Sequence, residues 1–289
     1  FPFFFIYLLF LFNTKVHSRE DVENLTTVPV ISEIPDFSSF EERVFKDPSD
    51  RSIIAESTRM LISNFRYIIP YDKKNKIILI TSSVKGEGKT LTALNSALGF
   101  ASLNKKVLLI GCDLRNPQLH NYLDVDKTNK GLVDFLIDSK SDWRMNVINY
   151  FENAPTLDIL ISGPLPPNPL NLINNGNLEL IIEQAKKEYE YIIFDSAPTL
   201  LVADTNSLFN IADSVIFITR SNVTEKEIIN HISNQCKSIE VNCGIVLNGV
   251  GQKNAYGYSY GYKYSYGYNY KYSYNYGYGY GYNSDDDKS

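Results

Sequence analysis

Short apolar runs alternate with helix-like patterns along the middle of the chain. Residues 51–69 and 90–103 place apolar side chains at helical spacing. Strands that are apolar on both faces and separated by helices are typical of a parallel sheet covered on both sides. The pattern predicts one α/β domain, over residues 51–252, with a mostly parallel central sheet flanked by helices. Six apolar runs have the length of buried strands, at residues 77–80, 107–110, 157–161, 191–194, 215–219 and 244–247.

The N-terminal part of the chain departs from this pattern. Residues 1–12 are almost wholly apolar, but a bilayer-spanning helix takes about 20 residues. Because Lys15 and Arg19 follow at once, we interpret the run as the cut end of a transmembrane helix that leaves the rest of the chain in the cytosol. A buried N-terminal strand or helix is the alternative. Residues 13–50 are polar and interrupted by prolines, which predicts a juxtamembrane linker with short local structure.

The C-terminal segment, residues 253–289, is of low complexity. Its tyrosines alternate with Gly, Ser, Asn and Lys, and it offers no aliphatic side chain larger than alanine with which to build a core. This composition predicts a disordered tail. Strict period-two tyrosines also fit a β-strand or an aggregation-prone segment. The tyrosines of the repeat are Tyr256, Tyr258, Tyr260, Tyr262, Tyr264, Tyr266, Tyr268, Tyr270, Tyr272, Tyr274, Tyr276, Tyr278, Tyr280 and Tyr282.

Charge and cysteine content narrow the class of protein. The net charge is −5 and the isoelectric point is about 5.3, so no basic surplus offsets phosphate charge and a dedicated nucleic-acid binder is disfavoured. Cys112, Cys236 and Cys243 have no metal-ligand spacing and suit a reducing cytosol.

A glycine-rich loop follows the first strand of the predicted domain. Residues 83–90 read Ser-Val-Lys-Gly-Glu-Gly-Lys-Thr and precede a predicted helix. Gly86 and Gly88 leave room for backbone N–H groups to close around phosphate oxygens, Lys89 can reach the outer phosphates, and the Thr90 hydroxyl is placed to ligate Mg²⁺. A glycine-rich turn that caps a helix is the alternative. The loop predicts a P-loop NTPase fold, although its usual first glycine is Ser83.

Two acidic strand ends support a nucleotide site. Asp113 lies just past the run at 107–110, and Asp195 directly follows the run at 191–194. Because the carboxyl ends of parallel strands meet at one edge of a sheet, both aspartates are expected beside the loop, where they can hold Mg²⁺. Taken singly, each would read as a helix cap or turn residue.

Together, these segments resemble the bacterial tyrosine kinases of capsule and exopolysaccharide export, over residues 13–282. In that family the loop is the Walker A motif, Asp113 lies in the A′ motif and Asp195 ends the Walker B motif. Residues 14–35 are similar to the stretch after the family's second transmembrane helix, and residues 162–169 to a segment between A′ and B. Residues 244–248 match a late strand whose asparagine lies near the base in related ATPases.

The resemblance implies an ATP- and Mg²⁺-dependent tyrosine autokinase that phosphorylates its own tail, with the fourteen phenols as acceptors. It assigns Lys89, Asp113 and Asp195 to catalysis and Thr90, Asp113 and Asp195 to the metal. It further implies that copies of the chain associate, with a ring as one form of the assembly. The implied partners are a periplasmic chain-length-determinant portion outside this sequence, the polysaccharide export machinery and a tyrosine phosphatase. The implied location is the cytoplasmic face of the bacterial inner membrane. The expected nucleotide-binding residues are Ser83, Lys85, Gly86, Glu87, Gly88, Lys89, Thr90 and Asn248.

Departures from the family pattern keep two rivals open. The first A′ aspartate is Gly111 here, which weakens the assignment of a general base, and the helical Glu-x-x-Arg-x-x-Arg motif survives only as Glu56 and Arg59, with Ile62 at the third position. Lys85 stands where a proline is common. One rival is a partition-type or positioning ATPase, which has no use for fourteen phenols. The other is a nucleotide-binding scaffold that has lost catalysis at Gly111.

Overall fold

The structure is a computed structural model that describes residues 14–37, 43–45, 49–200 and 204–251. The chain divides into two units, Phe1–Gln252 and Lys253–Ser289. The tyrosine tail and the apolar run at residues 1–12 lie outside the described residues. Across the described residues, no helix combines the length and the apolar character needed to cross a membrane.

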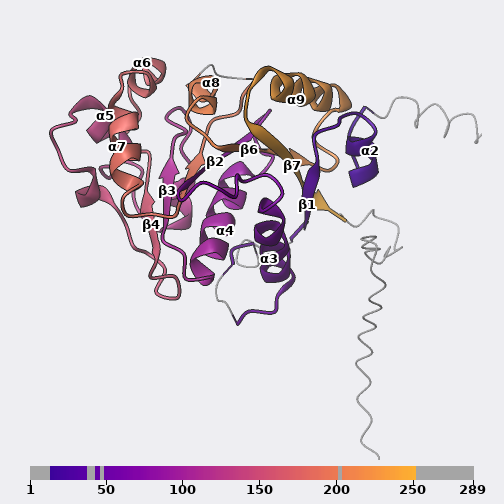
Figure 1. Cartoon of the computed structure of the whole chain (residues 1–289), viewed down its shortest axis with the longest axis horizontal. Coiled ribbons are helices and arrows are strands. Elements are labelled where there is room, and N and C mark those ends of the chain that lie inside the picture. The colour runs from indigo at the N-terminus through magenta and orange to yellow at the C-terminus, as the bar shows by residue number, and fades with distance from the viewer. Residues whose placement is uncertain (1–13, 38–42, 46–48, 201–203, 252–289) are drawn as a thin grey trace, which may run out of the picture. The chain divides into compact units, whose positions relative to one another are not determined.

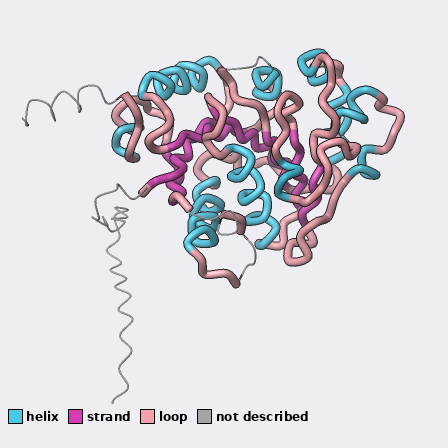
Figure 2. The backbone as a smooth tube through the Cα atoms, turned by 180° about the vertical axis from the view of Figure 1, so that it is seen from behind, coloured by secondary structure: helices cyan, strands magenta, loops and turns pink. Residues whose placement is uncertain are grey.

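A seven-stranded sheet forms the centre of the first unit, and every neighbouring pair of strands is parallel. The strand order is β1-β7-β6-β2-β5-β3-β4, and Figure 2 shows the strands as one continuous band between the helices. The sheet confirms the predicted parallel α/β class. The strands are β1 (Val30–Pro35), β2 (Lys76–Ser82), β3 (Val107–Gly111), β4 (Leu157–Leu160), β5 (Tyr191–Asp195), β6 (Ser214–Arg220) and β7 (Asn242–Val250).

The period of two along each strand divides the core into two layers. In β2, Ile77 and Leu79 pack into one cluster of buried side chains, whereas Ile78 and Ile80 pack into the other. All four side chains are at most 1% exposed, so each face of the strand is fully covered. Continuous burial explains why the predicted strands appear in the sequence as unbroken apolar runs.

The helices cover both faces of the sheet (Figure 1). Buried side chains of α3 and α4 belong to one core layer, and those of α2 and of α5 to α9 belong to the other. The helices are α2 (Arg19–Glu23), α3 (Ile53–Phe65), α4 (Lys89–Ser102), α5 (Leu132–Ile137), α6 (Pro169–Ile173), α7 (Asn177–Ala185), α8 (Asp204–Phe209) and α9 (Lys226–Ser238), with 3₁₀ turns at Leu119–Tyr122 and Trp143–Asn146.

The structure differs from the sequence analysis in the stretch predicted as a linker, residues 13–50. Residues Val30–Pro35 form an edge strand, β1, which pairs in parallel with β7. The strand is short and contains Ser32 and Glu33, so its sequence lacks the apolar run that marks the inner strands. Pro35 is tolerated because an edge strand has one side without a ladder partner. β1 is therefore part of the sheet. Its last residue, Pro35, lies near the glycine-rich loop at residues 83–90.

Candidate functional site

The phosphate loop joins β2 to α4 and depends on two left-handed glycines. Gly86 has φ of +89° and Gly88 has φ of +99°, a region that L side chains rarely adopt. A Cβ on Gly88 would lie 2.2 Å from Nδ2 of Asn248. That amide donates a hydrogen bond to the carbonyl of Glu87 at 2.9 Å. The end of β7 is thereby attached to the loop, and the close approach requires glycine at position 88.

The Glu87 side chain turns back under the loop and holds its backbone. Its Oε2 accepts hydrogen bonds from the N–H groups of Ser83 and Val84, both at 3.0 Å, and its Oε1 accepts one from the Thr224 hydroxyl. Burial raises the pKa of Glu87 to about 7, although these three hydrogen bonds oppose the shift. The Glu87 side chain therefore holds the backbone of the loop in place. It does not line the pocket that opens beside the loop.

Glu87 should make stability fall as pH rises. Its pKa is about 7 in the folded chain and about 4.3 in an unfolded one, so the folded state binds more protons between these values. The free energy of unfolding should therefore decrease between about pH 4.5 and 7.5, by an amount on the order of 3 kcal/mol, and then level off. Replacing Glu87 by glutamine should remove this part of the pH dependence in urea titrations. The exposed Glu179→Gln control should keep it, and parallel curves for Glu87→Gln and the parent chain would contradict the assignment.

Two buried aspartates and one lysine converge at the carboxyl edge of the sheet. Nζ of Lys89 lies 3.0 Å from Oδ2 of Asp113, and the Thr90 hydroxyl donates to Oδ1 of Asp195 at 3.1 Å. β5, which ends at Asp195, lies between β2 and β3, so the strand order itself places Asp195 between the loop and Asp113. Asp113 is fixed further by the N–H of Asn116, which donates to its Oδ1 at 2.9 Å.

Burial sets the electrostatics of this cluster. Asp195 is 1% exposed and Asp113 is 2% exposed. Burial raises the pKa of Asp195 to about 6, against the opposing effect of the Lys89 ammonium. Burial also tends to lower the pKa of Lys89, but the carboxylates of Asp195 and Asp113 outweigh it and hold that pKa above its usual value. The ammonium therefore stays charged at neutral pH beside two carboxyl groups.

A pocket of about 280 Å³ opens beside the loop. Of the predicted nucleotide-binding residues, Lys85, Gly86, Gly88, Lys89, Thr90 and Asn248 line it, whereas Ser83 and Glu87 do not. Asp113 and Asp195 lie beneath it, where they contact Lys89 and Thr90.

Several pocket residues were not predicted. Arg43 and Arg220 add two cations to the lining, and Asp36 and Phe37 follow β1 into the same wall. Arg220 donates to the carbonyl of Gly86 at 3.2 Å. Arg220 ends a buried strand, as Asp195 does, so the strand-end argument could have identified it. Arg43 carries no such signal in the sequence.

The space beside Gly111 is already filled by Ser162. Gly111 pairs with Asp195 across the sheet, and the Ser162 hydroxyl donates to its carbonyl at 2.8 Å. A Cβ on Gly111 would lie 2.8 Å from Oγ and 3.0 Å from N of Ser162. Asp113, two residues further on, is the carboxylate that contacts Lys89.

A parallel sheet, a phosphate loop at its carboxyl edge and two acidic strand ends beside the loop define a P-loop nucleotide-binding protein. A family model described as "AAA domain" matches residues 75–247. The tyrosine-protein kinase YwqD of Bacillus subtilis (strain 168) is 36% identical over 190 residues, which cover 66% of this chain and 78% of that protein. The chain belongs to the AAA domain family and, within it, to the bacterial tyrosine-protein kinases.

Two further matches define the extent of the likeness. A putative tyrosine-protein kinase in the cps region of Klebsiella pneumoniae is 30% identical over 220 residues, which cover 73% of this chain but 29% of that protein. The crystal structure of the chimerical protein CapA2B2 superposes with a TM-score of 0.70 at 28% identity, covering 80% of this chain and 98% of that one. The chain thus spans most of the length of some of the proteins that it matches and less than a third of the length of another.

Proposed function

We propose that this protein transfers the terminal phosphoryl group of ATP to tyrosines, and that the fourteen tyrosines from Tyr256 to Tyr282 are its main acceptors. The observation that carries the proposal is the convergence of Lys89, Thr90 and two buried aspartates at one sheet edge, in a chain that also carries a regular series of phenols. The kinase family supplies the reaction class, and the tail supplies a substrate within the same molecule.

Phosphoryl transfer needs positive charge at the phosphates and a group that accepts a proton, and different residues of the site provide these. Transfer forms a bond between a phenol oxygen and phosphorus and breaks the bond to ADP, so it depends mainly on placement and on neutralising phosphate charge. Lys89 and the loop amides provide positive charge for the phosphates. The phenol must lose a proton, because its pKa near 10 keeps it protonated at neutral pH. We assign Asp113 to orient the phenol and accept this proton, because the first A′ position is Gly111.

The donor set fits Mg²⁺. The Thr90 hydroxyl and the Asp195 carboxylate lie together at 3.1 Å, and Asp113 contacts Lys89 at 3.0 Å. Mg²⁺ takes one or two carboxylates in sites of this kind and completes its shell with water and phosphate. Thr90 and Asp195, with Asp113, would hold Mg²⁺, which when bound neutralises phosphate charge.

The proposed setting is the regulation of capsular or exopolysaccharide polymerisation and export at the cytoplasmic face of the bacterial inner membrane. The proposal includes self-association, a membrane-linked chain-length determinant, the export machinery and a tyrosine phosphatase as partners. Each phosphate adds between about −1.5 and −2 charges, so full modification of the tail adds roughly −21 to −28. Because the chain is already acidic, we expect such a tail to weaken the assembly.

A mixing experiment tests whether transfer occurs between copies. A Lys89→Met chain with an intact tail is incubated with a parent chain that ends at residue 252, together with ATP and Mg²⁺. We expect phosphotyrosine on the Lys89→Met chain, because a tail about thirty residues long has a reach of ~30 Å and can enter a neighbouring site. Phosphate that appears only when an active site and a tail share one chain would contradict transfer in trans.

A nucleotide-binding scaffold is the second candidate, and one observation favours it. Ser162 fills the place of the missing A′ aspartate, so the proton of the phenol has one carboxylate fewer to receive it. Tight ATP binding without any phosphotyrosine would select the scaffold.

A further inference from the structure

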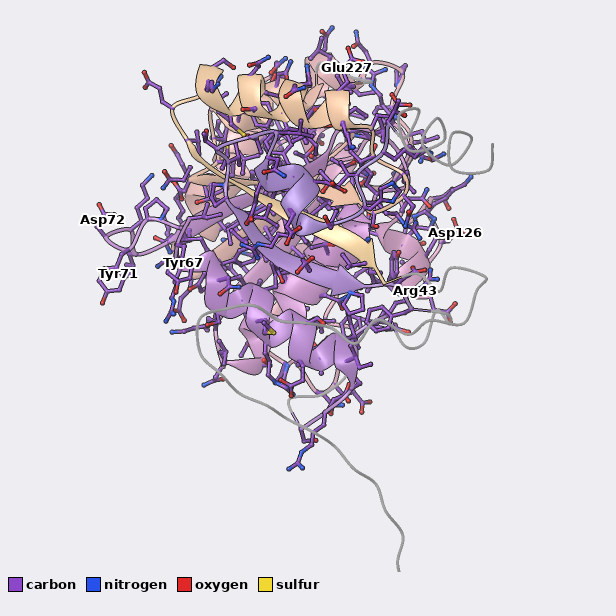
Figure 3. The ribbon with its side chains drawn as sticks, turned by 90° about the vertical axis from the view of Figure 1, so that its right-hand side faces the viewer. Arg43, Tyr67, Tyr71, Asp72, Asp126 and Glu227 are labelled. Carbon is purple, nitrogen blue, oxygen red and sulfur yellow. The ribbon has the colours of Figure 1, made fainter. Side chains whose placement is uncertain are left out.

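A second pocket lies at the amino edge of the sheet, away from the phosphate loop. Its volume is about 580 Å³, and its lining includes Lys76 and Tyr191, the first residues of β2 and β5, together with the C-terminal parts of α3 and α4. In Figure 3, Tyr67 and Tyr71 lie on one side of the molecule and Arg43, which lines the nucleotide pocket, lies on the other. Tyr71, at the rim of the second pocket, is 99% exposed.

The pocket wall contains a row of stacked aromatic rings. Phe65 stacks on Phe100 with ring centroids 5.6 Å apart, and Phe100 stacks on Tyr191 at 3.9 Å, with 18° between the ring planes in each pair. Ile62 adds an aliphatic surface to this wall. Gly99 allows this packing, because a Cβ there would lie 2.7 Å from Cγ1 of Ile62. Phe65 and Phe100 are themselves buried, at 0% and 3% exposed, so the half-buried Tyr191 presents the ring that a flat aromatic ligand would contact.

The charged residues that line the pocket are all cations. Two of them already have acidic partners: Arg59 pairs with Glu56 at 2.7 Å and Lys105 pairs with Glu190 at 3.0 Å. Among the described residues that line the pocket there is no aspartate or glutamate. The lining cations are Arg59, Arg66, Lys76 and Lys105.

Arg66 and Lys76 are placed to bind an anion beside the aromatic wall. Arg66 donates to the Tyr67 hydroxyl at 2.8 Å, and Lys76 donates to the carbonyl of Lys73 at 2.7 Å, so both of these partners are uncharged. Nζ of Lys76 also lies 5.5 Å from the centroid of the Tyr191 ring. The pocket therefore presents the ring of Tyr191 with the Lys76 ammonium beside it, and Arg66 as a second cation of the lining, which suits an aryl phosphate.

We propose that this pocket binds a phosphotyrosine of the tail, residues 256–282, after the phosphoryl group has been transferred. The proposal rests on the autokinase function proposed above, because that reaction produces the ligand. The described chain ends at Gly251, just past the carboxyl end of β7. β2, at seven residues, spans roughly 23 Å from one edge of the sheet to the other. The tail, in which tyrosines alternate with Gly, Ser, Asn and Lys, is about thirty residues long and has a reach of ~30 Å as a flexible chain, so the tail of the same chain or of a second copy can reach the pocket.

Capture of the product would separate it from the site that made it. A phosphotyrosine held at the amino edge of the sheet lies away from the phosphate loop, so an unmodified tyrosine can take its place beside ATP. The bound phosphate would also be shielded from a phosphatase. The pocket would thus distinguish the phosphorylated tail from the unmodified tail by binding the phosphorylated form.

Peptide binding tests the proposal without any kinase reaction. A fluorescein-labelled peptide of residues 260–272 is synthesised with Tyr266 either phosphorylated or free, and its anisotropy is measured on titration with the dephosphorylated full chain in the absence of ATP. We expect the phosphopeptide to bind at least about tenfold more tightly than the free peptide, because two charge-assisted contacts are added. Phenyl phosphate should compete at a lower concentration than inorganic phosphate.

Surface variants locate the bound peptide. Arg66→Gln with Lys76→Gln should weaken phosphopeptide binding at least about tenfold, whereas Lys74→Gln with Lys106→Gln, which changes two exposed lysines outside the lining, should leave it unchanged. Equal binding of the two peptides, or equal loss in both double variants, would overturn the proposal. A change in the mass of the assembly on Arg66→Gln with Lys76→Gln, without a change in phosphopeptide affinity, would also overturn it and make the pocket a contact between copies. Because the peptide is synthetic, these outcomes are independent of whether the chain phosphorylates itself.

Discussion

Replacing Lys89 by methionine should lower the rate of tyrosine phosphorylation by about a thousandfold. The Lys89 ammonium pairs with Asp113 at 3.0 Å and also interacts with Asp195, and Lys89 lines the pocket beside the loop. Preorganised positive charge at the transferring phosphoryl group is usually the largest contribution to this kind of catalysis, and removal of one such donor costs about 10²–10³ in rate. Initial rates of phosphotyrosine formation at saturating ATP measure the loss.

The same change should also affect the folded state, so activity and stability must be measured together. Without Lys89, the ammonium that opposes the raised pKa of Asp195 is lost, so burial should raise that pKa further. The variant should therefore lose more stability than the parent as pH rises above about 4. Near-ultraviolet circular dichroism at pH 6.5 checks that the variant is folded where its rate is measured. Lys186→Met, at the exposed end of α7, is the matched control and should retain full activity. A folded Lys89→Met chain that phosphorylates tyrosine at the parent rate would contradict the site assignment.

Replacing Asp195 by asparagine should separate activity from stability. The carboxylate is nearly inaccessible, and burial raises its pKa to about 6, above the value of about 3.9 in an unfolded chain. The folded state therefore loses stability as pH rises from about 4 to 6 and does not regain it above that range. Asparagine keeps an oxygen for the Thr90 hydroxyl and leaves Lys89 paired with Asp113. The variant should be more stable than the parent at pH 7.5, by about 1–3 kcal/mol.

Phosphorylation by the Asp195→Asn chain should nevertheless fall by about a hundredfold or more, because the proposed Mg²⁺ site would lose a carboxylate and would hold the ion, and its positive charge at the phosphates, less well. Urea unfolding and initial rates, measured on one preparation, test both expectations. Asp138→Asn, an exposed change outside the site, should alter neither quantity. A variant that is both destabilised and fully active would show that Asp195 is a structural residue.

The sequence predicted the inner part of the fold because burial on both faces leaves a direct mark on a strand. The run at residues 77–80 has no polar position, and the structure places it at the centre of the sheet. β1 lacks that mark, because an edge strand tolerates Glu33 and Pro35, and only its pairing with β7 identifies it as part of the sheet. The pattern of apolar and polar residues therefore could not predict this edge strand.

The same distinction applies to the site. The loop is a local feature, so its position followed from a few adjacent residues, and Asp113 and Asp195 followed from strand ends. Thr224 holds Glu87 from a position 137 residues away, and Arg43 reaches the pocket from a segment with no strand or helix pattern. Contacts of this kind depend on the folded chain, as do the aromatic wall and the cations of the second pocket. Glu87 illustrates the limit, because its sequence position did not indicate that its side chain holds the loop backbone and does not line the pocket, and its assignment to nucleotide binding stays a prediction.

Intact-mass analysis of the full chain, incubated with ATP and Mg²⁺, tests the central claim most directly. We expect a ladder of steps of about 80 Da, with every added phosphate in peptides from residues 253–289, and no ladder in the Lys89→Met chain. An unchanged mass in a chain that binds ATP tightly would contradict the autokinase and identify a nucleotide-binding scaffold in which Gly111 has removed catalysis.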